Sequence, residues 1–218
     1  ILCYYDLLAS KYAGGSEILK EVYTLNDQGD RKLGLRYDLT VPFSKVISMN
    51  AGKTINLPFK RYEIGKVFRD GPVKTGRARE FYQCDIDVIG NETLSILYDA
   101  EIPSIIYDLF KKLNIGDFTI RINNRKVLTG FFNSLELSDI VTDILRIIDK
   151  IEKIGEDATR SELSYLGIDD EKVSKIMNFI RISGNPFEKI NKLKELSITD
   201  PVFNEGVSEL ETVITNIR

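Results

Sequence analysis

The segment Lys66–Gly90, KVFRDGPVKTGRAREFYQCDIDVIG, contains the end of one β-patterned arm, a loop rich in glycine, proline and basic residues, and a second β-patterned arm. Polar and apolar residues alternate in FKRYEIGKVFR (Phe59–Arg69) and in AREFYQCDIDVI (Ala78–Ile89), as in half-buried strands. The connecting loop DGPVKTGR is too long for a two-residue turn but short enough to join antiparallel neighbours. The segment therefore predicts an antiparallel strand pair, with Arg69 at the end of the first strand.

One face of the second strand carries an unusual set of side chains. Successive strand side chains point to opposite faces, so one face holds Arg79, Phe81, Gln83, Asp85 and Asp87. Burying such charges without partners would cost several kcal/mol each. We interpret this face as part of a binding pocket. The alternative is a solvated sheet face with scattered ion pairs, which is common in antiparallel sheets.

The loop after Arg69 has the composition of a phosphate-binding segment. Gly71 and Gly76 leave backbone N–H groups accessible as hydrogen-bond donors, and Arg77 adds a cation. The planar guanidinium of Arg69 suits bidentate contact with a phosphate. Phe81 offers a flat surface on which a purine could stack. The alternative is an exposed basic turn. Neither the Walker pattern nor GxGxxG occurs, so these two nucleotide-binding motifs are excluded.

The stretch LGLRYDLTVPF contains a second polar pair. Asp38 and Thr40 are two positions apart, so they share a face if the segment is extended. A carboxylate beside a hydroxyl suits an ammonium group. The alternative is capping of the helix expected over VPFSKVISMN, a role that Thr40 fits better than Asp38, which lies early for it.

The composition restricts the chemistry. The chain has 218 residues, a net charge of −3 and no histidine, so a Ser-His-Asp or Cys-His nucleophile and an imidazole zinc site are excluded. Cys3 and Cys84 match no metal-ligand spacing, and we expect no protein-bound metal. Catalysis would then depend on positioned charge, as in phosphoryl or nucleotidyl transfer. No membrane span or signal peptide is apparent, which favours a cytoplasmic location.

The pattern of hydrophobic residues changes along the chain. Strand-like segments, including DFTIRIN (Asp117–Asn123), occur in the first part, with a helical stripe over Asn91–Leu113. From about Leu135 the strand signals end, and four or five helices are separated by breaks such as LGIDD and SGNPF. The prediction is an α+β domain over residues 1–134 followed by an all-helical module over residues 135–218.

Two motifs resemble a known family. GLRYDLTVPFSKVI and KRYEIGKVFRDGPVKTGRAREFYQCDIDVIG resemble histidyl-tRNA synthetases, which are class II aminoacyl-tRNA synthetases. The likeness runs from about Tyr4 to Asn124 and more loosely through the helical remainder. It implies an incomplete class II catalytic domain, an antiparallel sheet with flanking helices that contains motif 2, followed by the family's helical insertion domain.

The resemblance implies a reaction and roles for three residues. Histidine and ATP with Mg²⁺ would form histidyl-adenylate, and the histidyl group would pass to tRNA(His). Arg69, the catalytic residue, would bind the ATP α-phosphate near the amino-acid carboxylate. Arg77 would reach the outer phosphates, and Phe81 would stack on adenine.

Four further residues would bind histidine by the same resemblance. Asp38, Thr40 and Gln83 would hold its α-amino group, and Asp87 would contact its imidazole. An acidic side chain there suits recognition of an imidazole N–H. The family also implies a homodimer for the full-length protein and no membrane partner.

Several family elements have no counterpart in the chain, including a GLDYYTG-like segment, motif 3, most of motif 1 and the anticodon-binding domain. We therefore expect an internal fragment of histidine–tRNA ligase that is inactive by itself. The alternative function is a histidine-sensing, synthetase-like regulatory subunit of ATP phosphoribosyltransferase. The large helical module and the intact motif 2 residues favour the ligase.

Overall fold

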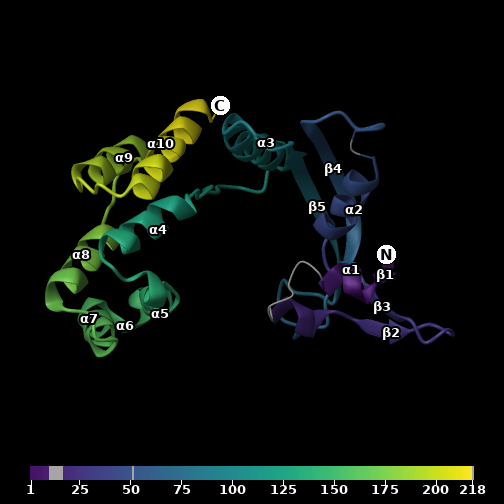
Figure 1. Ribbon diagram of the computed structural model, residues 1–218, viewed down its shortest axis with the longest axis horizontal. Coiled ribbons are helices and arrows are strands. Elements are labelled where there is room, and N and C mark those ends of the chain that lie inside the picture. The colour runs from purple at the N-terminus through teal and green to yellow at the C-terminus, as the bar shows by residue number, and fades with distance from the viewer. Residues whose placement is uncertain (10–16, 51, 218) are drawn as a thin grey trace. The chain divides into compact units, whose positions relative to one another are not determined.

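The computed structural model describes residues 1–9, 17–50 and 52–217. Contacts divide the chain into two compact units, Ile1–Leu94 and Ser95–Arg218, and each is considered by itself (Figure 1). Within the described residues, every named strand belongs to the first unit and the second is built from helices. The predicted order, an α+β part before a helical part, is confirmed.

Two antiparallel sheets form the first unit. One has the strand order β1-β3-β2, and the other is the ladder of β4 and β5. The segment NDQGD (Asn26–Asp30) leads from β2 to β3, and the predicted long loop joins β4 to β5. The elements in chain order are β1 (Leu2–Tyr4), α1 (Tyr5–Ala9), the 3₁₀ helix η2 (Glu17–Glu21), β2 (Thr24–Asn26), β3 (Lys32–Leu35), α2 (Thr40–Asn50), β4 (Phe59–Phe68) and β5 (Glu80–Ile89).

Backbone hydrogen bonds join the segment after β3 to the end of β4. Phe68 N donates to Arg36 O at 3.0 Å, and the Arg36 side chain returns a bond from Nε to Lys66 O at 2.8 Å. Asp70 N donates to Glu21 O at 2.7 Å, which brings the end of η2 to the start of the β4–β5 loop. A small apolar core lies beneath this junction and contains Leu8, Val22, Tyr37 and Val41.

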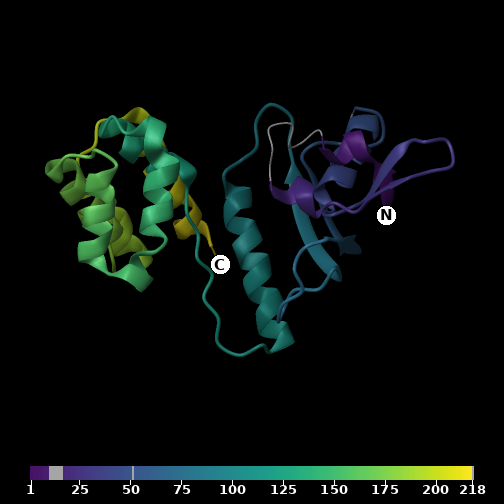
Figure 2. The same cartoon turned by 90° about the horizontal axis from the view of Figure 1, so that it is seen from below.

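The second unit is a helical bundle with its own apolar core (Figure 2). Helix α4 packs closely on α10: a Cβ at Gly130 would collide with the Phe203 backbone, so only glycine fits at this crossing. The helices are α3 (Leu97–Leu113), α4 (Arg125–Ser134), the 3₁₀ helix η3 (Ser138–Ile140), α5 (Val141–Ile148), α6 (Ile151–Ile154), α7 (Glu156–Tyr165), α8 (Asp170–Ile180), α9 (Pro186–Glu195) and α10 (Pro201–Asn216).

Two features of this unit bear on the sequence analysis. The strand predicted over Asp117–Asn123 is wrong, because the segment pairs with no strand among the described residues. Helix α4 begins after Asn124, whose side chain accepts a bond from Lys126 N at 2.9 Å. Helix α4 also contributes to the helical core, while the domain boundary between residues 134 and 135 stays a prediction.

Candidate active site

The β4–β5 register places the predicted polar face on one side of the ladder. Arg61 pairs with Asp87, Glu63 with Asp85, and Gly65 with Gln83. We call the set Arg61, Glu63, Gln83, Asp85 and Asp87 the strand floor. Its members are half-buried, whereas the opposite face exposes Tyr62 and Tyr82 to 79% and 67%. The polar side chains therefore lie on the more protected face, which argues against a fully solvated surface.

Arg69 immediately follows β4 and is fixed by two contacts. Its Nε donates to Tyr37 O at 3.1 Å, and its Cζ lies 5.3 Å from the centroid of the Phe81 ring. Its backbone N also donates to Arg79 O at 2.9 Å, which extends the ladder by one step. The guanidinium is held through Nε, and its terminal nitrogens have no hydrogen-bond partner among the described residues, so they are available for a ligand.

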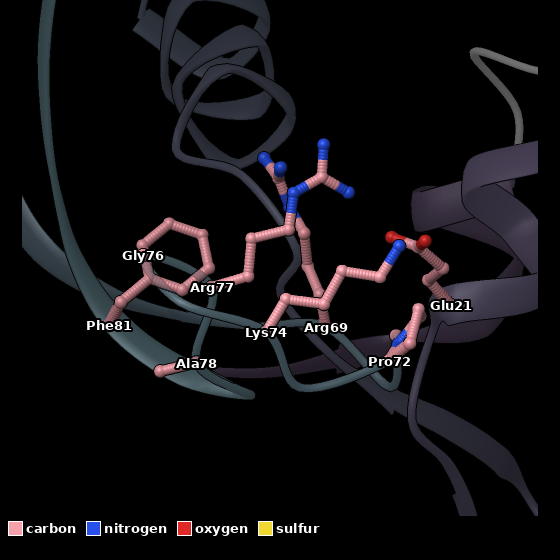
Figure 3. Close-up of a pocket in the computed structure, with 9 residues that line it drawn as sticks. Glu21, Arg69, Pro72, Lys74, Gly76, Arg77, Ala78 and Phe81 are labelled. Carbon is pink, nitrogen blue, oxygen red and sulfur yellow. The ribbon is translucent and has the colours of Figure 1, made fainter.

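A pocket of about 580 Å³ opens beside Arg69, under the β4–β5 loop. We call it the loop pocket. Figure 3 shows the Arg69 and Arg77 guanidinium groups between Phe81 on one side and Glu21 on the other. The nine residues that line it are Glu21, Arg69, Gly71, Pro72, Lys74, Gly76, Arg77, Ala78 and Phe81.

The loop has a defined turn at its tip. Arg77 N donates to Lys74 O at 2.8 Å, and Lys74 N donates to Arg77 O at 3.3 Å. Gly76 closes this turn with a φ of +77°, which favours glycine. The turn holds two cationic side chains on the lining of the loop pocket. Three cations beside an aromatic ring suit a polyphosphate attached to a planar base.

Asp38 and Thr40 do not share a strand face. Strand β3 ends at Leu35 and Thr40 is the first residue of α2, so the segment is not extended as the pairing required. The 8% exposed Asp38 accepts a hydrogen bond from Val41 N at 3.1 Å. Asp38, and not Thr40, therefore caps the helix, and our expectation that Asp38 lies too early is wrong. The chain turns before Thr40, which brings the Asp38 carboxylate over the first free N–H groups of α2.

Gln83 carries a free acceptor. Its Nε2 donates to Asp85 Oδ1 at 2.6 Å, which fixes the amide plane. Its Oε1 is buried and has no hydrogen-bond partner among the residues that the structure describes. A buried acceptor without a partner costs stability, so this oxygen is suited to accept an N–H from a ligand.

Asp87 is joined to Arg61 by an ion pair, Oδ2 to Nη2 at 2.8 Å. Burial raises the pKa of the Asp87 carboxyl, and the positive charge of Arg61 opposes that rise. The nearby carboxylates Asp85, Glu63 and Asp38 raise the pKa further. Arg61 is thus the cation that favours the ionised form of Asp87.

The structure divides the predicted site residues into two groups. Arg69, Arg77 and Phe81 line the loop pocket, while Gln83 and Asp87 lie along the strand floor, where the charge of Asp38 also reaches Asp87. Thr40 begins α2 beside the Asp38 cap, and no contact joins it to Gln83 or Asp87 within the described residues.

Sequence reasoning missed three residues of the site. Arg61 and Glu63 alternate with Tyr62 on β4, so the strand period could have placed them opposite Asp87 and Asp85. Glu21 reaches the loop pocket from η2, and no local pattern signals that approach. Among the described residues, no group of three or more potential ligands could hold a metal ion.

The antiparallel ladder, the arginine at its end and the cationic loop beside an aromatic ring are features of the class II aminoacyl-tRNA synthetase fold. The family model for histidyl-tRNA synthetase matches residues 1–218. A histidine–tRNA ligase from Clostridium tetani is 56% identical over 213 residues, which are 98% of this chain and 47% of that protein. The chain belongs to the histidyl-tRNA synthetase family.

Solved structures agree with this assignment. The crystal structure of histidyl-tRNA synthetase from Nostoc sp. PCC 7120 has a TM-score of 0.84 and 42% identity, covering 100% of this chain and 48% of that one. An ATP phosphoribosyltransferase regulatory subunit/histidyl-tRNA synthetase from Bacillus halodurans has a TM-score of 0.79, covering 99% of this chain and 53% of that one, but at 18% identity it shows the fold alone.

The chain spans about half the length of the curated relatives it matches. Histidine–tRNA ligase 1 of Bacillus cereus strain ZK / E33L, for example, is 47% identical over 212 residues, which are 95% of this chain and 47% of that protein. Each helix within the described ranges is too short or too polar to cross a bilayer.

Proposed function

We propose that the chain is part of a cytoplasmic histidine–tRNA ligase that activates histidine with MgATP and transfers it to tRNA(His). The main support for this proposal is the position of Arg69. Its side chain lines the loop pocket and is hydrogen-bonded to Tyr37 O, in the segment that bears Asp38. One guanidinium thus lies between the site suited to a nucleotide and the residues suited to an amino acid. The 56% identity to the Clostridium tetani ligase supports the same reaction.

In this proposal the loop pocket binds ATP. Arg69 contacts the α-phosphate, Arg77 and Lys74 contact the outer phosphates, and the adenine stacks on Phe81. The histidine carboxylate attacks the α-phosphorus, a new O–P bond forms, and the bond to the pyrophosphate oxygen breaks. Arg69 stabilises the negative charge that develops on the α-phosphate oxygens. Mg²⁺ enters with ATP as part of the substrate.

The strand floor binds histidine together with Asp38 and Thr40. Asp38, Thr40 and the unpartnered Gln83 Oε1 receive the α-ammonium group, and the Asp87 carboxylate accepts the imidazole N–H. The nucleophile is already a carboxylate at neutral pH, so the reaction needs no protein imidazole as a base. The absence of histidine from this chain is therefore compatible with the proposed reaction.

The finer organisation is also proposed. Residues 1–134 form part of the catalytic domain, and residues 135–218 form the insertion domain. The full-length enzyme works as a homodimer, and the 218-residue chain has no activity by itself, because a complete class II site needs motif 3.

The proposal is tested by histidine-dependent exchange of pyrophosphate into ATP with the full-length protein. Arg69→Ala should lower the exchange rate by roughly 100- to 1,000-fold, as expected for the loss of a group that stabilises transition-state charge. The matched control is Arg31→Ala in the β2–β3 turn, whose side chain is 63% exposed, and it should exchange at the wild-type rate.

Two results would contradict the proposal. Equal rates for Arg69→Ala and Arg31→Ala would remove Arg69 from the reaction. Histidine binding by the wild-type protein without any exchange would instead favour the histidine-sensing regulatory subunit.

A further inference from the structure

Arg61 is the most highly connected side chain of the strand floor, and it is only 10% exposed. Its Nη1 lies 2.6 Å from Glu63 Oε2, and its Nη2 lies 2.8 Å from Asp87 Oδ2. The same Nη2 donates to Leu39 O at 3.0 Å. The guanidinium also stacks on Phe43, with Cζ 4.1 Å from the ring centroid. These contacts leave it little freedom to move.

One nitrogen of Arg61 therefore joins the two elements that carry the acidic groups of the proposed histidine site. Leu39 directly follows Asp38 in the chain, and Asp87 lies on β5. Arg36 and Arg69 also hold this segment, Arg36 through Lys66 O and Arg69 through Tyr37 O, and neither of these two bonds involves Asp87. Arg61 thus links the residue that follows Asp38 to Asp87.

We propose that Arg61 is a positioning residue of the histidine site, which fixes Asp87 relative to Asp38 and keeps the Asp87 carboxylate ionised and oriented. The inference rests on the proposed function, because it assigns Arg61 a role through residues proposed to bind histidine. Among the described residues, the contacts of Arg61 are with protein groups, so it would act on a ligand through Asp87. Its contact with Asp87 is an ion pair through the buried Oδ2, which makes no hydrogen bond among the described residues.

The charges around Asp87 support this role. Burial raises the pKa of Asp87, Arg61 opposes the rise, and Asp85, Glu63 and Asp38 add to it. Arg36 also faces this cluster, with Nη1 3.5 Å from Glu63 Oε1. Removing Arg61 would leave the carboxylates in excess and raise the pKa of Asp87 further. Part of the enzyme would then hold a protonated Asp87, which is a poorer acceptor for an imidazole N–H.

A purely structural role for Arg61 predicts different behaviour. If Arg61 only held β4 to the segment before α2, its loss would weaken the whole site, including Arg69. The Michaelis constants for ATP and histidine would then change together, and the pH profile would keep its shape. A positioning role affects histidine selectively and moves the acid limb of the profile.

The experiment measures pyrophosphate exchange by the full-length protein with Arg61→Gln, Arg61→Lys and the control Arg31→Gln. For Arg61→Gln we expect the KM for histidine to rise roughly 10- to 100-fold, as for a displaced binding group, while the KM for ATP stays within about twofold. The acid limb of kcat/KM for histidine should move to higher pH. Arg61→Lys should recover part of the loss, because it restores the charge without the forked geometry.

A double-mutant cycle with Asp87→Asn tests the path of the effect. If Arg61 acts through Asp87, the KM for histidine of the double variant should be about equal to that of the Asp87→Asn single variant. Additive losses, equal changes in both Michaelis constants or an unmoved acid limb would each overturn the inference while leaving the ligase function intact. Absence of exchange in the wild-type protein would overturn both. If circular dichroism shows that Arg61→Gln is unfolded at the assay temperature, the test is made with Arg61→Lys, using the two Michaelis constants and the pH profile.

Discussion

The strand floor and the loop pocket are neighbours on the same ladder, yet their charged side chains differ in how they are paired. In the strand floor, Arg61 is paired with both Glu63 and Asp87 at 2.6 to 2.8 Å. In the loop pocket, no ion pair joins Arg69, Lys74 or Arg77 to a carboxylate in the part of the chain that the structure describes. In the strand floor the single cation is fully paired with carboxylates, whereas the loop pocket presents a surplus of positive charge.

The difference follows from burial and from the proposed ligands. Half-buried charges on a strand need partners, because unpaired ions are costly away from water. The paired floor is therefore fixed in advance, which favours recognition of a small ligand by shape and hydrogen bonds. The loop is exposed, so its cations remain solvated until a polyphosphate brings the opposite charge. Selectivity for the amino acid would reside in the floor, and attraction of the nucleotide in the loop.

The largest effect is expected from removing the loop charges. In the double variant Lys74→Ala/Arg77→Ala the KM for ATP should rise roughly 100-fold at low salt, since each lost charged hydrogen bond to phosphate is worth about 1.5 kcal/mol. The effect should shrink as salt is added, because exposed charges are screened. The KM for histidine should stay unchanged. Exchange kinetics at two salt concentrations measure both quantities.

The control removes the same charge elsewhere in the first unit. Lys53→Ala/Arg31→Ala takes away one lysine and one arginine that lie outside the lining of the loop pocket. An equal rise in the KM for ATP in this control would mean that net charge, and not the loop, attracts the nucleotide. The contrast between loop and floor would then be lost.

The features that were predicted from the sequence are those encoded locally. The period of two defined the β4–β5 ladder and its polar face, and the composition of the loop indicated the cationic pocket. The capping role of Asp38 was missed because it depends on where the chain turns after β3, which local spacing does not specify. The strand predicted over Asp117–Asn123 likewise assumed a neighbouring strand to pair with. Local extension suggests a strand, but a strand also needs a neighbour.

A second prediction concerns pH and the burial of Asp87. The pKa of Asp87 is raised, mainly by burial, above the ordinary aspartate value of 3.8. The folded protein therefore binds this proton at a higher pH than the unfolded chain. The contribution of Asp87 to stability is fully present below the unfolded pKa and is lost as pH rises through the folded pKa. Relative to Asp87→Asn, the wild-type protein should gain unfolding free energy as pH falls toward 3.8.

Asp27 in the β2–β3 turn provides a control of opposite sign. A backbone hydrogen bond from Arg31 is the main cause that lowers the pKa of Asp27, so its contribution is present above the unfolded pKa and lost as pH falls through the folded pKa. Relative to Asp27→Asn, the wild-type protein should lose stability on acidification. Urea unfolding between pH 3 and 7 measures both differences, and slopes of the same sign would show that Asp87 is not buried as described.

The smallest effect is expected for Gly71→Ala in the loop pocket, and its matched counterpart is Gly65→Ala in the ladder. A Cβ at Gly71 would lie 3.1 Å from Glu21 Oε1, the far end of a flexible side chain that can move aside. A Cβ at Gly65 would lie 2.8 Å from Arg36 Nη2 and 3.2 Å from Leu39 Cδ2, and Arg36 is held by Lys66 O. We expect Gly71→Ala to change the KM for ATP by less than about threefold.

Gly65→Ala should instead destabilise the protein by roughly 1 to 3 kcal/mol, as for overpacking of a close-packed site. Because Arg36 also contacts Glu63, the partner of Arg61, the displacement should reach the histidine site and raise the KM for histidine more than the KM for ATP. Both variants add one methyl group, so thermal unfolding and exchange kinetics on the two variants compare how the loop and the strand floor tolerate the same change. Equal tolerance at both positions would mean that the floor is no more rigid than the loop, and the proposed separation of selectivity from charge attraction would fail.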